Sequence, residues 1–380
     1  MLSYPNKRPF AKRMLLQHRN QPLQVELDND RTYPIVFDAL AKLPEALRKA
    51  KLRPGKCLVV ADSNVATHYR SRLDALLKDD GWEPLILTLP AGEATKSPKH
   101  LQAIYDAALA WRIDRRTPVL ALGGGVIGDL AGFAAATLLR GLPFVQIPTS
   151  LIAQVDSAIG GKTGINHFEG KNLIGVFHQP ELVFIDTALL YTLPRREWLG
   201  GLAEVIKHAL IQDATFFDWM EAEFQRVLAR DPGIVPDLIY RAVSIKAKIV
   251  SEDEKEQGRR MILNFGHTFG HALEKTLGYG VYSHGEAVIL GMKAALHMSR
   301  RFNRKLDQTR AENVLNAIPM PPIPASLGIP AVREAMESDK KRDGDQLRFV
   351  LLTKIGSAYV TDDVTPSDIE SAWAHALGRP

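Results

Sequence analysis

Residues 119–139 read VLALGGGVIGDLAGFAAATLL, and this stretch predicts the fold of the first half of the chain. The apolar residues 119–122 predict a short strand, glycines follow at once, and residues 130–139 predict a helix. The glycines satisfy the pattern G-x-G-x-x-G between Gly123 and Gly128. A glycine turn that opens a helix presents free N–H groups and the positive end of the helix dipole to a pyrophosphate. The stretch therefore predicts a strand–turn–helix unit that can hold a dinucleotide.

Two features depart from a standard dinucleotide fingerprint. The glycines lie far from the start of the domain, and Thr149 and Ser150 stand where an acid is expected about 20 residues further on. A tight turn with no ligand is therefore an equal alternative. Asp62 and Asn64 follow another predicted strand and could serve the adenosine end of a dinucleotide. That role depends on a crossover that spacing alone does not show.

Short apolar runs separated by helical patterns continue on both sides of this unit. Ser97 and Pro98, for example, begin a helical pattern. Alternation of this kind predicts a mainly parallel sheet flanked by helices, as in a Rossmann-like α/β domain. Besides residues 119–122, the predicted strands are residues 24–27, 33–37, 57–61, 84–89, 144–147 and 182–185.

The second half of the chain has a different pattern. Amphipathic helical patterns dominate residues 197–301, and a proline cluster at 319–330 interrupts them. A hairpin of residues 347–353 and 357–361 and a helix over 367–377 are expected to follow. We therefore predict a basic extension, an α/β domain and a mostly α-helical domain, covering residues 1–20, 21–195 and 196–380.

Composition limits the class of protein. A chain of 380 residues with 46% hydrophobic and 24% charged residues is typical of a globular protein of two domains. It has no apolar run of about 18 residues, so no membrane span is predicted. Cys57 is the only cysteine, which suits a reducing compartment such as the cytoplasm. The net charge of +5 permits an anionic partner, but no nucleic-acid-binding motif accompanies it.

The first 20 residues contain five lysines or arginines and no acid. They lack the continuous apolar segment of a secretory signal. We expect a basic extension, with a short organelle-targeting peptide as the alternative.

Residues 263–292 read LNFGHTFGHALEKTLGYGVYSHGEAVILGM and contain a candidate metal site. His267 and His271 are spaced to lie on one face of a helix, and His284 follows among glycines. Catalytic zinc sites often use two histidines and one carboxylate, with one position open. Histidines at helical spacing are also common without a metal, which is the alternative. Several acids compete for the third ligand, namely Glu197, Glu204, Glu221 and Glu223.

Residues 148–175 are rich in small and polar residues and are expected to form a loop and a helix. Asp156, Lys162, Lys171 and Asn172 stand there among glycines. Because binding groups concentrate on loops, this segment is a candidate site for a polyhydroxylated, negatively charged ligand. A solvated connection without a ligand is the alternative.

Seven motifs in this order closely resemble the 3-dehydroquinate synthase family, a group of sugar-phosphate cyclases related to metal-dependent alcohol dehydrogenases. They are GGGVIGDLAGFAAA from Gly123, IPTSLIAQVDSAIGGKTGIN from Ile147, GKNLIG from Gly170, GLAEVIK from Gly201, LNFGHTFGHALE from Leu263, SHGEAV from Ser283 and DKK from Asp339. The resemblance extends from about residue 23 to the end of the chain. It implies the conversion of 3-deoxy-D-arabino-heptulosonate 7-phosphate to 3-dehydroquinate and phosphate. In that reaction a hydroxyl is oxidised transiently by NAD⁺, phosphate is eliminated, the ketone is reduced again, and an aldol step closes the ring.

The resemblance also implies which residues bind the cofactors. Zinc or cobalt would be held by Glu204, His267 and His284. NAD⁺ would contact Asp62, Asn64, Gly92, Glu93, Lys96, Gly124, Gly125, Val126, Ile127, Gly128, Asp129, Thr149, Ser150, Lys162, Lys171, Leu189 and Thr192.

The phosphorylated heptulosonate would meet a further, mostly basic set. It consists of Asp156, Lys162, Asn172, Lys207, Lys246, Arg260, Asn264, His271 and Lys341. Arg140 matches an arginine that reaches a phosphate across a homodimer.

Three departures from the family pattern occur. Ser150 replaces a frequent threonine, His208 replaces a frequent tyrosine, and residues 198–200 read WLG without an evident reason. The alternatives to the implied activity are another sugar-phosphate cyclase, a net alcohol dehydrogenase and a non-catalytic binding protein on the same fold. Arg260, Asn264 and His271 favour the dehydroquinate reaction over the sister cyclases.

Overall fold

A computed structural model describes residues 22–28, 31–278, 280–324, 327–340 and 347–379. The predicted basic extension lies outside the described residues. The chain forms two compact units. The first comprises Met1–Pro194 and Lys246–Lys255, and the second comprises Arg195–Ile245 and Glu256–Pro380. Lys246–Lys255, which falls in the second half of the sequence, thus belongs to the first unit.

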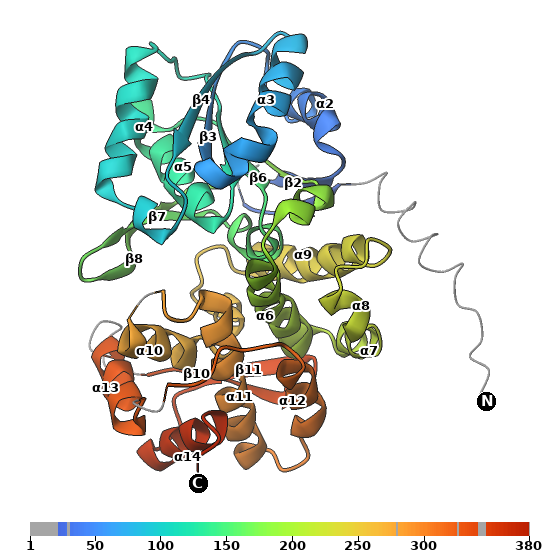
Figure 1. Ribbon diagram of the computed structural model, residues 1–380, viewed down its shortest axis with the longest axis vertical. Helices are drawn as coiled ribbons and strands as arrows, with labels where there is room; N and C mark the ends of the chain where they lie inside the picture. Colours follow the sequence, from blue (N-terminus) through green and yellow to red (C-terminus); the bar gives the residue numbers. More distant parts are fainter. Residues whose placement is uncertain (1–21, 29–30, 279, 325–326, 341–346, 380) are drawn as a thin grey trace, which may run out of the picture. The chain divides into compact units, whose positions relative to one another are not determined.

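The first unit is built on a seven-stranded sheet in the order β1-β2-β9-β6-β5-β3-β4 (Figure 1). β1 pairs antiparallel to β2, and all other neighbours are parallel. The strands are β1 (Leu23–Val25), β2 (Tyr33–Phe37), β3 (Lys56–Asp62), β4 (Glu83–Leu89), β5 (Val119–Gly123), β6 (Phe144–Pro148) and β9 (Leu182–Ile185). Every strand predicted for this domain is confirmed, because each apolar run is bounded by turn residues.

Helices cover both faces of the sheet (Figure 1). Along β3, Cys57, Val59 and Ala61 join the core beneath α2 and α3, whereas Leu58 and Val60 join the core beneath α4 and α5. Burial on both faces is typical of a parallel sheet. The helices and helical turns of this unit are η1 (Leu40–Lys42), α2 (Leu43–Lys49), α3 (Ser63–Asp79), η2 (Glu93–Thr95), α4 (Pro98–Ala110), α5 (Gly125–Thr137), η3 (Leu138–Arg140), η4 (Ala153–Ser157) and η5 (Thr187–Thr192).

A topological switch point lies between β3 and β5. The chain passes from β3 outward to β4 and then crosses to β5 on the other side of β3. Ligands of open α/β sheets bind at the carboxyl ends of the strands at such a point. Ala61 pairs with Leu122, so Asp62 and the glycine turn end neighbouring strands at this edge.

The prediction of a loop and a helix over residues 148–175 is wrong for most of that segment. It contains η4, which is a π-helical turn, and the hairpin of β7 (Lys162–His167) and β8 (Gly170–Phe177). Gly164 pairs with Gly175, and a Cβ on either would lie 2.4 or 2.2 Å from a carbonyl oxygen of the facing strand. The glycines that suggested a loop are thus needed for close backbone contact within a hairpin.

The second unit is mostly helical, as predicted, with one two-stranded sheet. The proline cluster separates α12 from α13, and the predicted hairpin and final helix are confirmed. Its elements are α6 (Arg195–Gln212), α7 (Ala214–Ala222), α8 (Phe224–Leu228), α9 (Val235–Glu252, which ends in the first unit), η6 (Arg259–Asn264), α10 (His267–Leu277), α11 (His284–Phe302), α12 (Gln308–Asn316), α13 (Ile329–Lys340), β10 (Phe349–Lys354), β11 (Ser357–Thr361) and α14 (Pro366–Ala376). Among the described residues, no helix is long and apolar enough to cross a membrane. The cytoplasmic location stays a prediction.

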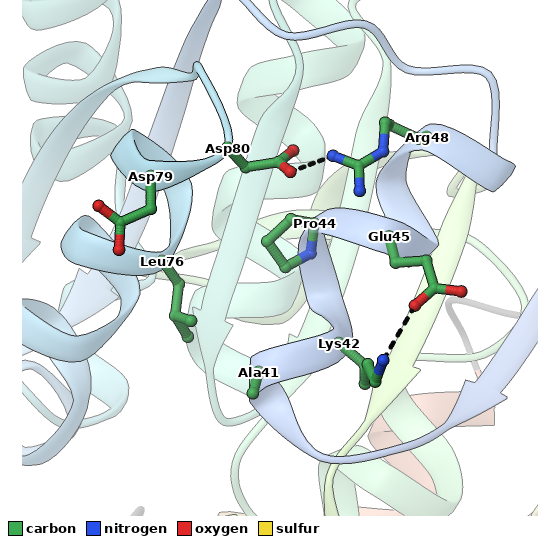
Figure 2. Close-up of a pocket in the computed structure, with 8 residues that line it drawn as sticks. All are labelled: Ala41, Lys42, Pro44, Glu45, Arg48, Leu76, Asp79 and Asp80. Atoms are coloured by element: carbon green, nitrogen blue, oxygen red, sulfur yellow. Dashed lines mark hydrogen bonds and ion pairs between the residues drawn. The ribbon is translucent and has the colours of Figure 1, made fainter.

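Figure 2 shows a hollow on the first unit between α2 and α3. Arg48 forms an ion pair with Asp80 there, and Lys42 contacts Glu45 at 3.3 Å. The charges of these groups therefore offset one another within the hollow. It contains none of the predicted site residues, since its lining is Ala41, Lys42, Pro44, Glu45, Arg48, Leu76, Asp79 and Asp80.

Candidate active site

Helix α6 carries a buried ion pair. Glu204 and Lys207, one helical turn apart, are 0% and 1% exposed, and Lys207 Nζ contacts Glu204 Oε2. A buried carboxylate needs compensation, because desolvation strongly disfavours an isolated charge. Within the described part of the chain, neither oxygen of Glu204 accepts a hydrogen bond of ordinary geometry, although the ion pair is close. Both oxygens of this carboxylate therefore have lone pairs available to bind a cation.

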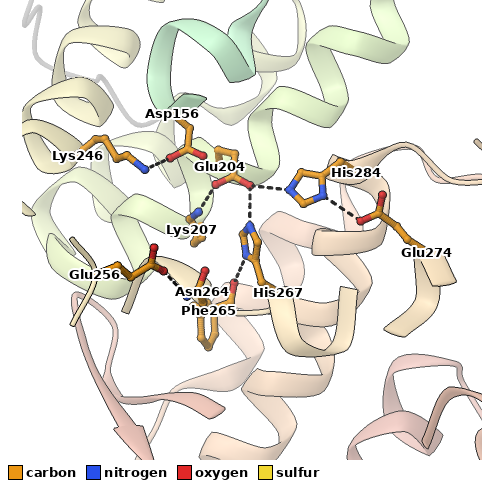
Figure 3. Close-up of polar contacts among 10 residues, drawn as sticks. All are labelled: Asp156, Glu204, Lys207, Lys246, Glu256, Asn264, Phe265, His267, Glu274 and His284. Atoms are coloured by element: carbon orange, nitrogen blue, oxygen red, sulfur yellow. Dashed lines mark hydrogen bonds and ion pairs between the residues drawn. The ribbon is translucent and has the colours of Figure 1, made fainter. Parts of the chain in front are cut away.

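His267 and His284 face the same carboxylate from α10 and α11 (Figure 3). Their Nε2 atoms lie 3.6 and 3.8 Å from Glu204 Oε1. One ligand atom from each of the three residues falls within 4.8 Å of the others. Nδ1 of His267 lies 3.3 Å from the carbonyl oxygen of Phe265, which can only accept a hydrogen bond. That contact leaves Nε2 with its lone pair toward Glu204, as a metal ligand requires.

A glycine-to-glycine contact brings α6 and α11 together. A Cβ on Gly285 would lie 2.0 Å from the carbonyl oxygen of Gly200, so only glycine fits at this position of α11. Glu286 accepts hydrogen bonds from Arg196 of α6 at 2.8 and 2.7 Å and completes a capping box with Ser283. The first residue of α11, His284, is therefore held in place from α6.

This packing explains the unusual WLG segment. Trp198 is fully buried, its Nε1 donates to the carbonyl of Val227 at 3.1 Å, and Arg230 stacks over its ring at 5.2 Å. The backbone carbonyl of Gly200 lies against Gly285. The segment anchors the helix that presents Glu204.

Glu274 adds a second carboxylate beside His284. Its Oε2 lies 3.1 Å from His284 Nδ1 (Figure 3). Burial by itself lowers the pKa of His284. The hydrogen bond and charge of Glu274, and then the charge of Glu204, outweigh burial, so the pKa of His284 is raised above its ordinary value.

The remaining candidates of the second unit lie on α10 and η6. His271 is exposed, and the centroid of its ring lies 5.4 Å from that of His267 and 5.8 Å from that of His284. Arg260, on η6, is 1% exposed. Asn264 donates to Glu256 Oε1 at 2.7 Å. Glu256, which has a positive φ of 58°, was not predicted, because it stands in the acidic run SEDEKE without a distinguishing feature.

A polar network joins several cofactor candidates of the first unit. Lys96, almost fully buried, contacts the carboxylate of Asp129 and the side-chain oxygen of Asn172. Burial raises the pKa of Asp129, and Lys96 opposes the shift. Asn166 donates to Glu93 at 2.6 Å and accepts from the backbone N–H of Asn172 at 2.9 Å.

Asn172 is held in the left-handed region with φ of 59°. A non-glycine residue is uncommon there and needs support from its surroundings. Asn166 supplies that support. Sequence reasoning missed Asn166, and its position at the end of the motif GGKTGIN was the available signal.

A lysine from α9 joins the segment after β6. Lys246 Nζ donates to Asp156 Oδ1 at 2.5 Å, although the two residues are 90 positions apart (Figure 3). Asp156 lies in the π-helical turn η4, a rare geometry that often occurs at functional sites. On the hairpin that follows, Lys162 is exposed and Lys171 is half-buried.

The glycine turn between β5 and α5 begins the helix earlier than predicted, at Gly125. No side chain caps this end of α5, which leaves it open to an anion. The glycines also serve packing, since a Cβ on Gly125 would lie 2.9 Å from Ser157 Oγ and one on Gly128 would lie 2.8 Å from Gln146 Oε1. Gly124 is the N-cap residue, and Val126 and Ile127 continue the first turn.

Other candidates have local structural partners. Asp62 caps α3 by accepting from the N–H groups of Asn64 and Val65 at 2.9 and 3.0 Å. The hydroxyl of Tyr69 contacts the carbonyl of Leu189 and the side chain of Thr192.

Three further candidates lie in the connections that follow strands, and a fourth lies outside the residues that the structure describes. Thr149 donates its N–H to Gly123 at 2.9 Å, and the Oγ of Ser150 accepts from Ala153 at 3.3 Å. Gly92 caps η2 with φ of 108°. Lys341 lies outside the described residues.

Two family models match consecutive parts of the chain, the 3-dehydroquinate synthase N-terminal model over residues 86–200 and the C-terminal model over residues 201–342. The chain belongs to the 3-dehydroquinate synthase family. A curated 3-dehydroquinate synthase of Salinibacter ruber is 54% identical over 94% of this chain and 98% of the relative.

Solved structures of related cyclases share the fold of the 3-dehydroquinate synthase family. A 2-epi-5-epi-valiolone synthase from Streptomyces hygroscopicus, solved with NAD⁺ and Zn²⁺, is 30% identical with a TM-score of 0.84, over 94% of this chain and 100% of that chain. A 2-deoxy-scyllo-inosose synthase was solved with carbaglucose-6-phosphate, NAD⁺ and Co²⁺. It is 26% identical with a TM-score of 0.83, over 95% of this chain and 100% of that chain.

Proposed function

We propose that this chain catalyses the 3-dehydroquinate synthase reaction. The substrate is 3-deoxy-D-arabino-heptulosonate 7-phosphate, the products are 3-dehydroquinate and inorganic phosphate, and the enzyme is a phosphorus–oxygen lyase. The observation that carries the proposal is the cluster of the buried Glu204 with His267 and His284, in a chain that is 54% identical to a 3-dehydroquinate synthase. Sister cyclases share the fold at lower identity, 30% and 26%.

Glu204, His267 and His284 fit a divalent metal. Two imidazoles and a carboxylate with free lone pairs are the donor set of many catalytic zinc sites, and Co²⁺ accepts the same ligands. Zn²⁺ or Co²⁺ bound there would supply Lewis acidity at a substrate hydroxyl or ketone oxygen. Lys207 is buried beside Glu204 and offsets its charge.

The carboxyl edge of the sheet in the first unit fits NAD⁺. Asp62 and the turn Gly124–Asp129 end adjacent strands there, and the amino end of α5 carries no side-chain cap. NAD⁺ would supply a transient hydride acceptor. The buried Lys96 holds Asp129 and Asn172 in fixed positions near the glycine turn.

The candidate substrate residues suit a phosphorylated acid. Lys246 is held by Asp156, so its ammonium group is already oriented for an anionic or hydroxyl partner. Arg260 is buried, where a guanidinium binds carboxylate or phosphate more strongly than at the surface. Asn264 and His271 belong to the same set, on η6 and α10. Once the ketone has acidified the neighbouring C–H group, the departing phosphate can take that proton itself, and positioned cations stabilise the negative charge of the phosphate as it leaves.

We infer that the enzyme acts as a homodimer. Arg140 is exposed on a turn where Leu139 and Arg140 both have positive φ, 50° and 70°. Such strain persists where the surrounding structure holds it and is concentrated at functional sites. The hairpin β7–β8 supports self-association, because it exposes the apolar side chains of Phe168, Leu173, Ile174, Val176 and Phe177. The molar mass in solution, measured by light scattering, tests this inference.

The decisive test is phosphate release from the heptulosonate 7-phosphate with NAD⁺ and Zn²⁺, with and without a chelator. Absorbance of NADH is recorded in the same sample. We expect chelator-sensitive phosphate release without net NADH. Net accumulation of NADH would indicate an alcohol dehydrogenase. Release only from a heptulose 7-phosphate that lacks the carboxylate would indicate a sister cyclase.

A further inference from the structure

Glu274 is a buried carboxylate with no assigned role in the ligand set. On α10 it follows His267 and His271 at positions i, i+4 and i+7, so all three side chains share one helix face. Its side chain is 4% exposed. A carboxylate is rarely buried to this extent unless a partner compensates its charge.

One partner of Glu274 is the ring of His284. Oε2 of Glu274 lies 3.1 Å from Nδ1, whereas Nε2 of the same ring faces Glu204 at 3.8 Å. An ionised carboxylate only accepts hydrogen bonds, so Nδ1 carries the proton and Nε2 keeps its lone pair. The geometry selects the one tautomer in which Nε2 can bind a metal.

The two ligand histidines are supported unequally. The ring of His267 is fixed by the backbone carbonyl of Phe265, a neutral acceptor that no substitution can remove. The ring of His284 depends on a side chain and is also the more exposed, at 34% against 11%. The orientation of His284 is therefore the part of the site that a single substitution can disturb.

We propose that Glu274 is a positioning residue that fixes the tautomer and ring orientation of His284 and adds one negative charge next to the bound cation. The inference rests on the proposed metal site. A carboxylate behind a ligand imidazole raises its basicity, and loss of such a partner typically lowers metal affinity about 10–100-fold. A merely structural role, as a buried link between α10 and α11, would change stability without changing affinity.

The experiment compares Glu274→Gln with the wild type. Glutamine keeps the volume of the side chain but removes its charge, and its amide can donate as well as accept, so it no longer enforces one tautomer. Asp368→Asn is the matched control. Asp368 is also a buried carboxylate of the second unit, 8% exposed, with an ion pair to Arg301 at 2.9 Å and a capping role on α14.

Three readouts separate the roles. Zn²⁺ affinity is measured by competition with a chromophoric chelator, and melting temperature is measured on metal-free protein. Imidazole ¹⁵N shifts of metal-free protein report the tautomer of neutral His284, assigned with His284→Ala. We expect Glu274→Gln to bind Zn²⁺ at least tenfold more weakly and to lose the exclusive Nδ1–H form. Asp368→Asn should melt earlier with unchanged affinity.

Wild-type Zn²⁺ affinity and an unchanged tautomer in Glu274→Gln would overturn the proposal. His267→Ala distinguishes this failure from failure of the metal site itself. If His267→Ala loses Zn²⁺ while Glu274→Gln does not, only the role of Glu274 is wrong. If His267→Ala also binds like the wild type, the metal site is wrong and the proposal falls with it.

Discussion

The contact between α6 and α11 predicts opposite outcomes for two glycine-to-alanine substitutions. Both glycines lie in helices, where alanine is intrinsically favoured by about 1 kcal/mol. A Cβ on Gly200 would meet Ser283 Oγ at 3.4 Å, an ordinary contact. A Cβ on Gly285 would meet the carbonyl oxygen of Gly200 at 2.0 Å. Gly200→Ala should therefore leave stability unchanged or raise it, whereas Gly285→Ala forces the helices apart.

The size of that displacement decides whether Gly285→Ala reduces stability or Zn²⁺ affinity more. Relief of the clash requires a shift of roughly 1 Å, because a Cβ atom rarely approaches an oxygen closer than about 3 Å. Overpacking of this kind costs about 1–3 kcal/mol, or about 2–12 °C in melting temperature for a unit of this size. Metal–ligand distances tolerate only about 0.2 Å. Since His284 begins α11 and Glu204 lies on α6, Gly285→Ala should affect Zn²⁺ affinity more than stability.

The assay is a melting curve of metal-free protein together with a Zn²⁺ competition titration for the wild type and both variants. Metal-free samples are essential, because bound metal raises the melting temperature by itself. We expect Gly285→Ala to lose at least tenfold in affinity and Gly200→Ala to retain the wild-type value. Equal affinity in the two variants would refute the link between this helix contact and the ligand geometry.

Burial raises the pKa of the Cys57 thiol to about 12, so the folded protein should resist thiol reagents at pH 8 until it is unfolded. Because the folded pKa exceeds that of the unfolded chain, the contribution of Cys57 to stability should be constant below pH of about 9 and fall above it by up to about 1.4 kcal/mol per pH unit, and Cys57→Ala should remove this part of the pH dependence. Asn166→Ala removes the hydrogen bonds to Glu93 and Asn172, and we expect roughly tenfold weaker NAD⁺ binding by fluorescence titration, with unchanged Zn²⁺ affinity. Arg140→Ala should raise KM for the phosphorylated substrate at least tenfold while light scattering still reports a dimer; an unchanged KM would contradict the role of Arg140.

The strands of the sheet could be predicted because each is a short apolar run that can be recognised from neighbouring residues alone. Runs such as residues 57–61 are apolar on both faces, and the structure buries them on both faces of β3. The hairpin β7–β8 was not predictable in the same way. Gly164 and Gly175 indicate a loop when only neighbouring residues are considered, and their pairing becomes visible only in the folded chain.

The third candidate metal ligand could not be chosen from local sequence either. Glu197, Glu221 and Glu223 competed with Glu204 on spacing. In the structure Glu197 is exposed, Glu221 forms an ion pair with Arg310, and Glu223 forms one with Arg226. Glu204 is the acid that the fold buries against two histidines. Family motifs pointed to it, but burial and distance are properties of the tertiary structure.

The candidate metal site is held by helix packing rather than by loops. Glu204 lies on the buried face of α6, and the Gly200–Gly285 contact sets the spacing to α11. The rings of His267 and His284 are oriented by Phe265 and Glu274. Small zinc domains need the metal in order to fold, because their ligands are brought together only by the ion. Here the helices that carry the histidines already bury apolar side chains such as Phe269, Leu273 and Val288. The second unit therefore does not need the ion in order to fold. Chelation should therefore abolish turnover while the helical circular dichroism of the second unit persists, and re-addition of Zn²⁺ should restore activity without a refolding phase.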